Sequence, residues 1–200
     1  MLNILNRGYT DILQLFYTDK CKSIHLRDIA KLTKYNENSV YRFLNKLEKD
    51  NILKSRRQAN LKLFSLKQNK KVYSILSFFD VEKYEKLPHI RKTALKCYFD
   101  ALEVKPIFAI LFGSTAKENF REDSDIDILL ITNSRIDTKK AEYAADTQSA
   151  MKVSTFQMTY KNFLKELKLK DDKVVQSAVH TGYPLINHIQ YYEVIFNETI

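Results

Sequence analysis

The apolar residues in the first third of the chain recur at helical spacing. The first set predicts an opening helix that ends near Asp19, and its members are Ile12, Leu13, Leu15 and Phe16. A second short helix is expected over residues 26–32. Asn36 is the expected N-cap of a third helix, with Glu37 in its first turn. The third helix should bury a stripe spaced i, i+3, i+4, i+7, formed by Val40, Phe43, Leu44 and Leu47.

A pair of short strands is expected after the third helix. Asn51 suits the left-handed conformation that commonly follows a helix. Strands over residues 52–55 and 61–66 would be joined by a polar turn over 56–60, which carries Arg56 and Arg57. A helix, a helix-turn-helix and then a hairpin form the winged-helix arrangement, and residues 1–68 resemble winged-helix transcription regulators. This resemblance implies a DNA-binding module.

The rest of the pattern predicts a helical connector and a further domain. Helices are expected over residues 69–85 and 89–103, separated by Pro88. The second of these should bury the stripe Ile90, Ala94, Cys97, Tyr98 and Ala101. The wholly apolar run 107–112 predicts a buried strand, as does 128–131. The expected organisation is therefore a winged helix-turn-helix domain over 1–68, a connector over 69–104 and a domain over 105–200.

The positive charge of the chain lies entirely in its first half. Residues 1–88 hold 18 Lys and Arg against 9 Asp and Glu, whereas residues 89–200 hold 15 of each, and the formal net charge is +9. This asymmetry predicts a local polyanionic partner, which we expect to be double-stranded DNA. The alternative is a solvated Lys-rich surface. The groups expected to read base edges are Asn38, Ser39 and Arg42, and those expected to contact phosphates are Tyr35, Lys46, Arg56, Arg57 and Lys62.

Two further features bear on the compartment. Cys21 and Cys97 are too few and too far apart for a disulfide framework or a zinc site, so we expect reduced, packed thiols. The first sixteen residues mix apolar side chains with Asn3, Arg7 and Asp11, which fits neither a signal peptide nor a membrane span. A cytoplasmic protein without membrane attachment is expected.

Candidate chemistry gathers around one of the three glycines. Gly113 ends the apolar run 107–112 and is followed by Ser114. A glycine at the end of a strand lets the backbone approach a phosphate, and the next hydroxyl can donate to it. Asp125 and Asp127 begin the next apolar run, and alternate side chains of a strand share a face. Two neighbouring carboxylates repel unless a cation lies between them, and Mg²⁺ suits oxygen ligands and substrate phosphates.

The segments Phe112-Gly113-Ser114-Thr115-Ala116 and Ser124-Asp125-Ile126-Asp127 together resemble the minimal nucleotidyltransferases of the DNA polymerase β superfamily. The resemblance continues through Gly182-Tyr183-Pro184-Leu185 and Tyr191-Tyr192-Glu193, where the family has its closing turn, strand and helix. It implies an α+β domain with a mixed sheet flanked by helices. It also implies transfer of a nucleoside monophosphate from a triphosphate to an acceptor hydroxyl. Gly113 and Ser114 would hold the nucleotide, and Asp125 and Asp127 would ligate catalytic Mg²⁺.

Two positions depart from the family's pattern. Glu118 stands where the family's loop often has a second glycine. The strand expected over 153–158 carries no acid, although active members have a third carboxylate there, and Ser154 or Phe156 occupies the corresponding place. A third carboxylate supplied from elsewhere in the chain would have to come from Glu142, Asp146 or Glu193. The alternative for each of these residues is an ordinary surface charge.

Three classes of function compete on this evidence. The first is a metal-dependent nucleotidyltransferase with a DNA-binding module. The second is a DNA-binding transcription regulator with a weak or inactive transferase domain. The third is one member of a toxin–antitoxin pair, because relatives of the domain often pair with a small helical protein. A homodimer is expected, as is common for winged-helix proteins on two half-sites. The Gly-Ser and Asp pairs favour nucleotide binding in all three classes, and we favour the transferase.

Overall fold

The computed structural model describes residues 6–59 and 61–199. It divides into two compact units, Met1–Phe79 and Asp80–Ile200. The division falls inside helix α4 (Lys70–Glu85), within the segment expected as a connector. In the described part of the chain, no helix is both long and apolar enough to cross a membrane.

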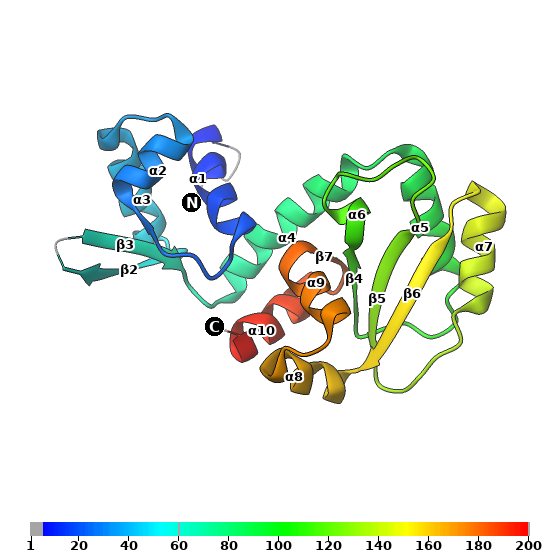
Figure 1. Ribbon diagram of the computed structural model, residues 1–200. Coiled ribbons are helices and arrows are strands. Elements are labelled where there is room, and N and C mark those ends of the chain that lie inside the picture. The colour runs from blue at the N-terminus through cyan, green and yellow to red at the C-terminus, as the bar shows by residue number, and fades with distance from the viewer. Residues whose placement is uncertain (1–5, 60, 200) are drawn as a thin grey trace. The chain divides into compact units, whose positions relative to one another are not determined.

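The N-terminal unit combines helices with a small antiparallel sheet (Figure 1). Its elements before α4 are α1 (Arg7–Thr18), β1 (Ile24–His25), α2 (Leu26–Thr33), α3 (Glu37–Lys49), β2 (Leu53–Gln58) and β3 (Leu61–Leu66). The strand order is β1-β3-β2. The two-residue strand β1, which pairs Ile24 with Phe64, was not expected from the sequence because it is too short to show a period.

The boundaries of helix α3 follow from its capping residues. Asn36 is its N-cap, and the Asn36 side chain accepts a hydrogen bond from the Ser39 backbone N–H at 2.8 Å. After the helix, Asn51 adopts a left-handed conformation with φ 62°. Both features match the sequence-based expectation. Of the expected apolar stripe, three residues are buried and Phe43 is half-buried.

The hairpin differs from the expectation at its first strand. β2 extends through Gln58, and its register pairs Arg56 with Leu63 and Arg57 with Lys62. Arg56 and Arg57 therefore belong to a strand and not to a turn. Pairing continues to Gln58 and Leu61 because the connection between the strands is only two residues long, which is favoured in hairpins. Ala59, the described residue of that connection, has φ 51°.

The C-terminal unit is a mixed sheet flanked by helices, as expected for an α+β domain (Figure 1). The strands are β4 (Phe108–Phe112), β5 (Ile126–Thr132), β6 (Val153–Thr159) and β7 (Tyr183–Ile186), in the order β6-β5-β4-β7. β5 and β6 run parallel, whereas β4 is antiparallel to both of its neighbours. The helices after α4 are α5 (His89–Ala101), α6 (Gly113–Ala116), α7 (Lys139–Ser149), α8 (Tyr160–Leu169), α9 (Lys173–Thr181) and α10 (His188–Thr199).

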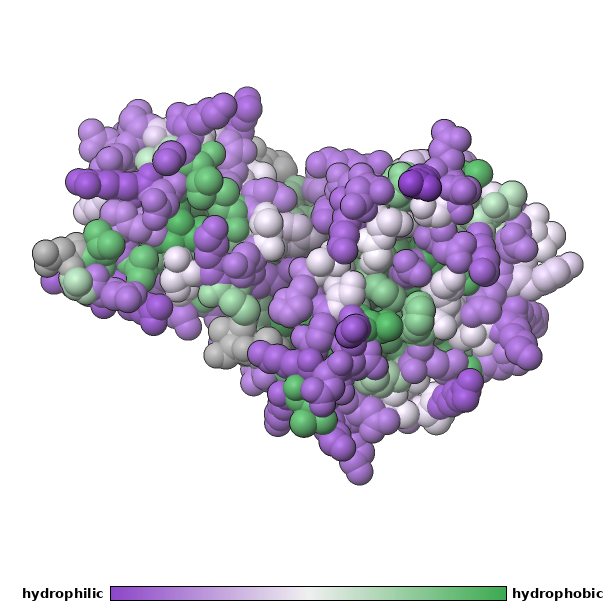
Figure 2. All heavy atoms as spheres, in the orientation of Figure 1, coloured by the Kyte–Doolittle hydropathy of each residue, from purple (hydrophilic) through white to green (hydrophobic). Residues whose placement is uncertain are grey.

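Helices cover both faces of this sheet. On one face, Ile126, Ile128 and Leu130 pack in one cluster with side chains of α5 and α7. On the other, Phe108 contacts Phe163 of α8 and Tyr191 of α10 edge to face. Figure 1 shows these two groups of helices on opposite sides of the strands. Hydrophilic side chains cover much of the surface seen in Figure 2. The central strands β4 and β5 are consequently almost wholly buried, as their apolar sequences require.

Helix α5 buries a different stripe from the one expected. Ile90, an expected core residue, is 48% exposed, while Arg91 is buried together with Ala94, Leu95 and Tyr98. The expected stripe did not include Arg91, and arginine is usually exposed. The structure instead gives Arg91 enough hydrogen-bond acceptors to be buried. Cys97 is half-buried and Cys21 is exposed, so the expectation of two packed thiols is wrong for Cys21.

Candidate nucleotide site and basic surface

Gly113 and Asp127 are in direct contact. Phe112, the last residue of β4, pairs with Asp127 of β5, and Gly113 follows with φ +71°, a conformation that side chains rarely adopt. A Cβ atom added to Gly113 would lie 2.2 Å from Oδ2 of Asp127. Glycine adopts this backbone angle without strain, and a side chain at this position would force the Asp127 carboxylate to move. The glycine that ends the strand and the second aspartate therefore form one site.

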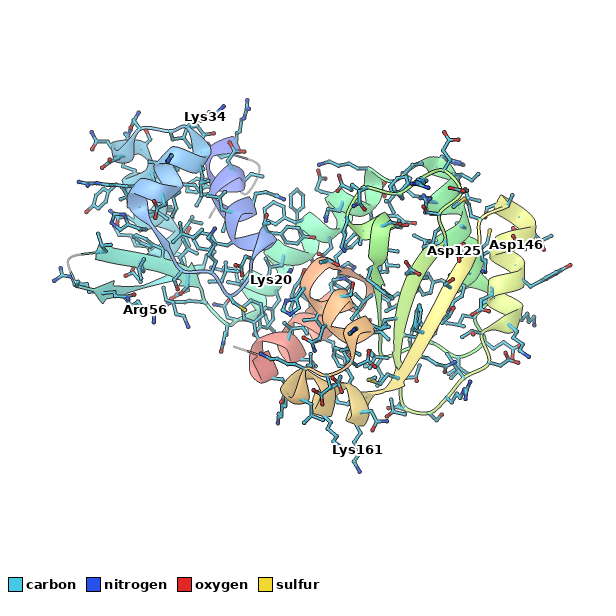
Figure 3. All side chains as sticks on the ribbon, viewed as in Figure 1. Lys20, Lys34, Arg56, Asp125, Asp146 and Lys161 are labelled. Atoms are coloured by element: carbon cyan, nitrogen blue, oxygen red, sulfur yellow. The ribbon has the colours of Figure 1, made fainter. Side chains whose placement is uncertain are left out.

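Asp125 lies one residue before β5 and is half-buried. Its Oδ2 accepts a hydrogen bond from the Ser154 hydroxyl at 3.0 Å. Lys152 Nζ is 3.3 Å from the same oxygen, but this lysine side chain is 72% exposed, so the pair is weak and easily displaced. Figure 3 labels Asp125, which lies by the start of the neighbouring strands β5 and β6.

The two aspartates repel each other. The pKa of Asp127 is raised, first because the carboxyl group is partly buried and then because the charge of Asp125 is nearby. Both causes disfavour a second negative charge at this position. A bound divalent cation would remove this penalty, and carboxylate oxygens are the ligands that Mg²⁺ prefers. The donor set therefore fits a metal held by Asp125 and Asp127.

Ser114 begins the turn after Gly113 and is half-buried. Within the described residues its hydroxyl takes part in no hydrogen bond, so it is available to a ligand. Glu118 has φ 59°. It stands where the loop of the nucleotidyltransferases that this chain resembles often has a second glycine. The loop thus adopts the left-handed conformation that a glycine would favour, even without one.

In the described part of the chain, no third carboxylate joins the pair. Ser154 is the register partner of Asp127 on β6, so the position expected to carry an acid carries a hydroxyl. Among the described residues, no group of three or more His, Cys, Asp or Glu side chains could hold a metal. Of the substitutes considered, Glu142 accepts a hydrogen bond from the Thr138 hydroxyl at 3.0 Å, and Asp146 is an exposed residue of α7 (Figure 3). Glu193 lies on α10, which has no residue in the pair or in the turn.

Arg91 is the residue of this site that the sequence analysis missed. It is 1% exposed, and one guanidinium nitrogen donates to the Thr115 hydroxyl at 2.8 Å. The other donates to the carbonyls of Arg121 and Ser124 at 2.9 and 3.0 Å. The guanidinium also lies 4.1 Å from the centre of the Phe120 ring. One buried side chain thus ties the turn after Gly113 to the loop that leads into Asp125.

Helix α3 presents two of the three expected base-reading residues to solvent. Asn38 and Arg42 are exposed, and Ser39 is half-buried next to the N-cap. Lys46, an expected phosphate contact, pairs with Asp50 at 3.0 Å. Tyr35, another expected contact, donates its hydroxyl hydrogen to Asp11 at 2.5 Å.

The hairpin separates its cations onto two faces. The Ser55 hydroxyl bonds to Glu48 of α3, and successive strand residues alternate, so Arg57 shares the face of α3 and Arg56 points the other way. Lys62 donates to Glu48 at 2.8 Å. Burial alone would raise the pKa of Glu48, but the hydrogen bonds from Lys62 and Ser55 outweigh it and hold the pKa below its ordinary value. Lys62 is therefore paired with Glu48, whereas Arg42 and Arg57 are exposed cations on the α3 side of the unit.

Comparison with known proteins adds one finding for the C-terminal unit. Residues 94–190 match the family model described as polymerase beta, nucleotidyltransferase. The comparison with curated proteins finds no match. The matched segment runs from α5 into α10 and contains the turn at Gly113 and both aspartates. Residues 94–190 are therefore similar to the polymerase beta nucleotidyltransferase family.

Proposed function

We propose that the C-terminal unit binds a nucleoside triphosphate with Mg²⁺ and transfers its nucleoside monophosphate to an acceptor hydroxyl. The observation that carries this proposal is the contact between Gly113 and Asp127. At this contact, backbone without a side chain lies beside one carboxylate of the aspartate pair. Asp125 and Asp127 would hold the metal. The Ser114 hydroxyl would donate to a phosphate oxygen that approaches the backbone at Gly113.

Bound Mg²⁺ would neutralise charge on the phosphates and orient them for displacement. In the transfer, the acceptor oxygen bonds to the α-phosphorus, the bond from that phosphorus to the bridging oxygen breaks, and pyrophosphate leaves. The proton of the acceptor hydroxyl must go to a base. Ser154 is the register partner of Asp127, where a third carboxylate would serve, so we expect this step to be slow.

The same observation favours a second candidate function. A domain that binds Mg²⁺ and nucleotide without fast transfer would suit a DNA-binding regulator that responds to a nucleotide. Two radiolabel outcomes distinguish the candidates. Incubation with each α-labelled NTP, Mg²⁺ and a cell lysate should move label onto RNA or protein if the domain is a transferase. Nucleotide binding with no transferred label would favour the regulator.

Nucleotide binding should depend on the aspartate pair. The double substitution Asp125→Asn with Asp127→Asn should abolish Mg²⁺-dependent NTP binding, with a loss of at least about 100-fold in affinity, because the metal loses both ionised ligands. Titration calorimetry with and without Mg²⁺ measures this. The fold should persist, since the change removes repulsion between like charges.

The matched control removes two charges from the same loop. Glu122 and Asp123 are both exposed, and Glu122→Gln with Asp123→Asn should leave binding within about twofold of wild type. Equal affinities of wild type and the Asp125/Asp127 variant would show that the metal–nucleotide site lies elsewhere.

For the N-terminal unit we propose a winged-helix module that binds duplex DNA. The support is the order α1, β1, α2, α3, β2, β3 with an antiparallel sheet, together with the exposed Asn38 and Arg42 on α3. Helix α3 would enter a major groove, where Arg42 can meet a guanine edge. The hairpin would contact the backbone through Arg57, while Lys46 and Lys62 are already paired with acids.

DNA binding by the full chain should weaken steeply with salt. Each phosphate neutralised changes the slope of log K against log salt by about 0.9, so Arg57→Ala should flatten the slope by roughly that amount on all sequences. Arg42→Ala should cost about 1–3 kcal/mol on a preferred site and little on random DNA. Fluorescence anisotropy over a salt series, after selection of a preferred site, measures both.

Arg56 provides the control for Arg57, because it is the neighbouring exposed arginine on the opposite face of β2. Arg56→Ala should change the slope less than Arg57→Ala. A full-length chain with no measurable affinity for any duplex at low salt would sink the DNA-binding proposal. The excess charge would then be a solvated surface.

A further inference from the structure

A second cavity in the C-terminal unit lies outside the candidate nucleotide site. It has a volume of about 560 Å³ and lies among α4, α5, β7 and α10, whose positions can be followed in Figure 1. Its apolar lining comes from Val81, Leu95, Phe99, Pro184 and Leu185. Neither aspartate of the pair lines it, and nor does Gly113 or Ser114. The volume is in the range of small-molecule sites.

A fully buried carboxylate orients one polar side chain in the wall of this cavity. Asp80 is 0% exposed, and the Tyr192 hydroxyl donates to its two oxygens at 2.8 and 2.9 Å. Nδ1 of His188 is 3.0 Å from Asp80 Oδ2. An ionised carboxylate only accepts, so Nδ1 carries the hydrogen in this bond. Packing alone does not require such a group, since apolar residues fill buried space at lower cost.

This arrangement leaves Nε2 of His188 for a ligand. The His188 side chain lines the cavity and is 22% exposed. Within the described residues, Nε2 has no hydrogen-bond partner. A histidine held at one nitrogen by a carboxylate has a fixed ring orientation, so the other nitrogen is aimed in advance.

The α5 wall of the cavity favours an anionic ligand. His89, Lys92 and Lys96 line it and recur three or four residues apart, so they share one side of the helix. Two acids also line the cavity. Glu85 is bound to Lys92 at 2.9 Å, and Asp100 lies at the far end of α5, after Phe99. Lys96 is exposed and has no ion pair among the described residues.

We propose that this cavity is a second ligand site, which binds a small organic anion through an apolar body and one phosphate or carboxylate group. Leu95, Phe99 and Leu185 would contact the body, and Lys96 would bind the anionic group. His188 would donate to the same group from Nε2 in its imidazolium form, in which both ring nitrogens carry hydrogen. The site does not depend on the proposed nucleotide site. It shares helix α5 with Arg91, which holds the loops of that site.

Phenyl phosphate is a suitable probe because it joins an aromatic ring to a phosphate. In ¹⁵N-labelled full-length protein without Mg²⁺, it should shift the amide signals of Thr93, Lys96, Leu185 and His188 saturably, with a dissociation constant on the order of 10⁻⁴ M. Phenol and inorganic phosphate each supply half of the interaction, and each should bind at least about tenfold more weakly.

Substitutions separate this site from its neighbours. His188→Gln should weaken phenyl phosphate binding at least about fivefold. The same change at His180, an exposed residue of α9, should leave it unaltered, and so should Asp127→Asn. Phenol binding as tightly as phenyl phosphate, or His188→Gln without effect, would overturn the proposal. So would the absence of saturable shifts at millimolar probe, or shifts confined to the turn at Gly113.

Discussion

Arg91→Met is expected to lower the melting temperature by about 10 °C, which corresponds to roughly 3–4 kcal/mol for a chain of this length. Methionine fills much of the space but donates no hydrogen bond. The Thr115 hydroxyl and the carbonyls of Arg121 and Ser124 would lose their donor in a buried place. Differential scanning calorimetry measures the shift. Burial lowers the pKa of Arg91, but an arginine remains charged at neutral pH, so the loss should be nearly constant between pH 6 and 8.

The control is the same substitution at an arginine of the same loop. The side chain of Arg121 is exposed, and only its carbonyl bonds to Arg91, so Arg121→Met should cost less than about 0.5 kcal/mol. Arg91→Lys should fall between the two, because an ammonium group cannot span all three acceptors in the plane of a guanidinium. Equal melting temperatures for Arg91→Met and Arg121→Met would mean that the buried hydrogen bonds contribute nothing to stability.

The elements that could be predicted from the sequence are those whose cause is local. Helix α3 begins where Asn36 caps it, and β4 is a strand because residues 107–112 offer no polar position for a surface helix. The alternation at the start of β5 correctly separated Ile126 and Ile128, which lie in one core cluster, from Asp127 on the other face. In each case the deciding residues lie within a few positions of one another.

The burial of Arg91 could not be predicted because its reason lies in tertiary structure. Its three acceptors are 24 to 33 residues away in the sequence, and two of them are backbone carbonyls, which leave no trace in residue type. The helical period of α5 is compatible with a buried stripe that includes either Ile90 or Arg91. The apolar Ile90 was therefore chosen as the core residue. Desolvating a guanidinium is unfavourable unless such acceptors are present.

Asp80 and His188 are likewise brought together only by the fold, since they are 108 residues apart. Nothing in the residues around either one indicates their hydrogen bond. The cavity beside it was not foreseen, since it is formed by four elements that meet only in the folded chain. The ion pair of Lys62 with Glu48 is a third example, because its partners are 14 residues apart and meet only when the hairpin lies against α3.

At the candidate nucleotide site, the residues chosen from the sequence lie together in the fold, but their contact was not predicted. Gly113 and Ser114 follow one strand and the aspartates begin the next, and antiparallel pairing of Phe112 with Asp127 brings them together. The register of β5 with β6 then identifies Ser154 as the neighbour of Asp127. The absence of an acid on β6 was visible in the sequence, whereas the hydrogen bond from Ser154 to Asp125 was not.

Gly113→Ala is expected to reduce the affinity for Mg²⁺ and NTP by about 100-fold and stability by roughly 3 kcal/mol. The new Cβ would lie 2.2 Å from Oδ2 and 3.1 Å from Cγ of Asp127, so the carboxylate must leave its position. The loss of affinity rests on the proposed nucleotide site, but the loss of stability does not. Chemical denaturation and calorimetry measure the two effects separately.

A double-mutant cycle distinguishes the steric clash from the backbone cost. In an Asp127→Ala background the contacts with Oδ2 and Cγ are gone, and Gly113→Ala should cost only about 1 kcal/mol, the usual penalty of a left-handed alanine. Ala150 has φ 52° and is exposed, so Ala150→Gly measures that penalty in reverse and should stabilise the chain by about 1 kcal/mol. If Gly113→Ala is equally costly in both backgrounds, Asp127 does not occupy the space beside Gly113. The contact between Gly113 and Asp127 would then no longer support the proposal that this site binds a nucleotide.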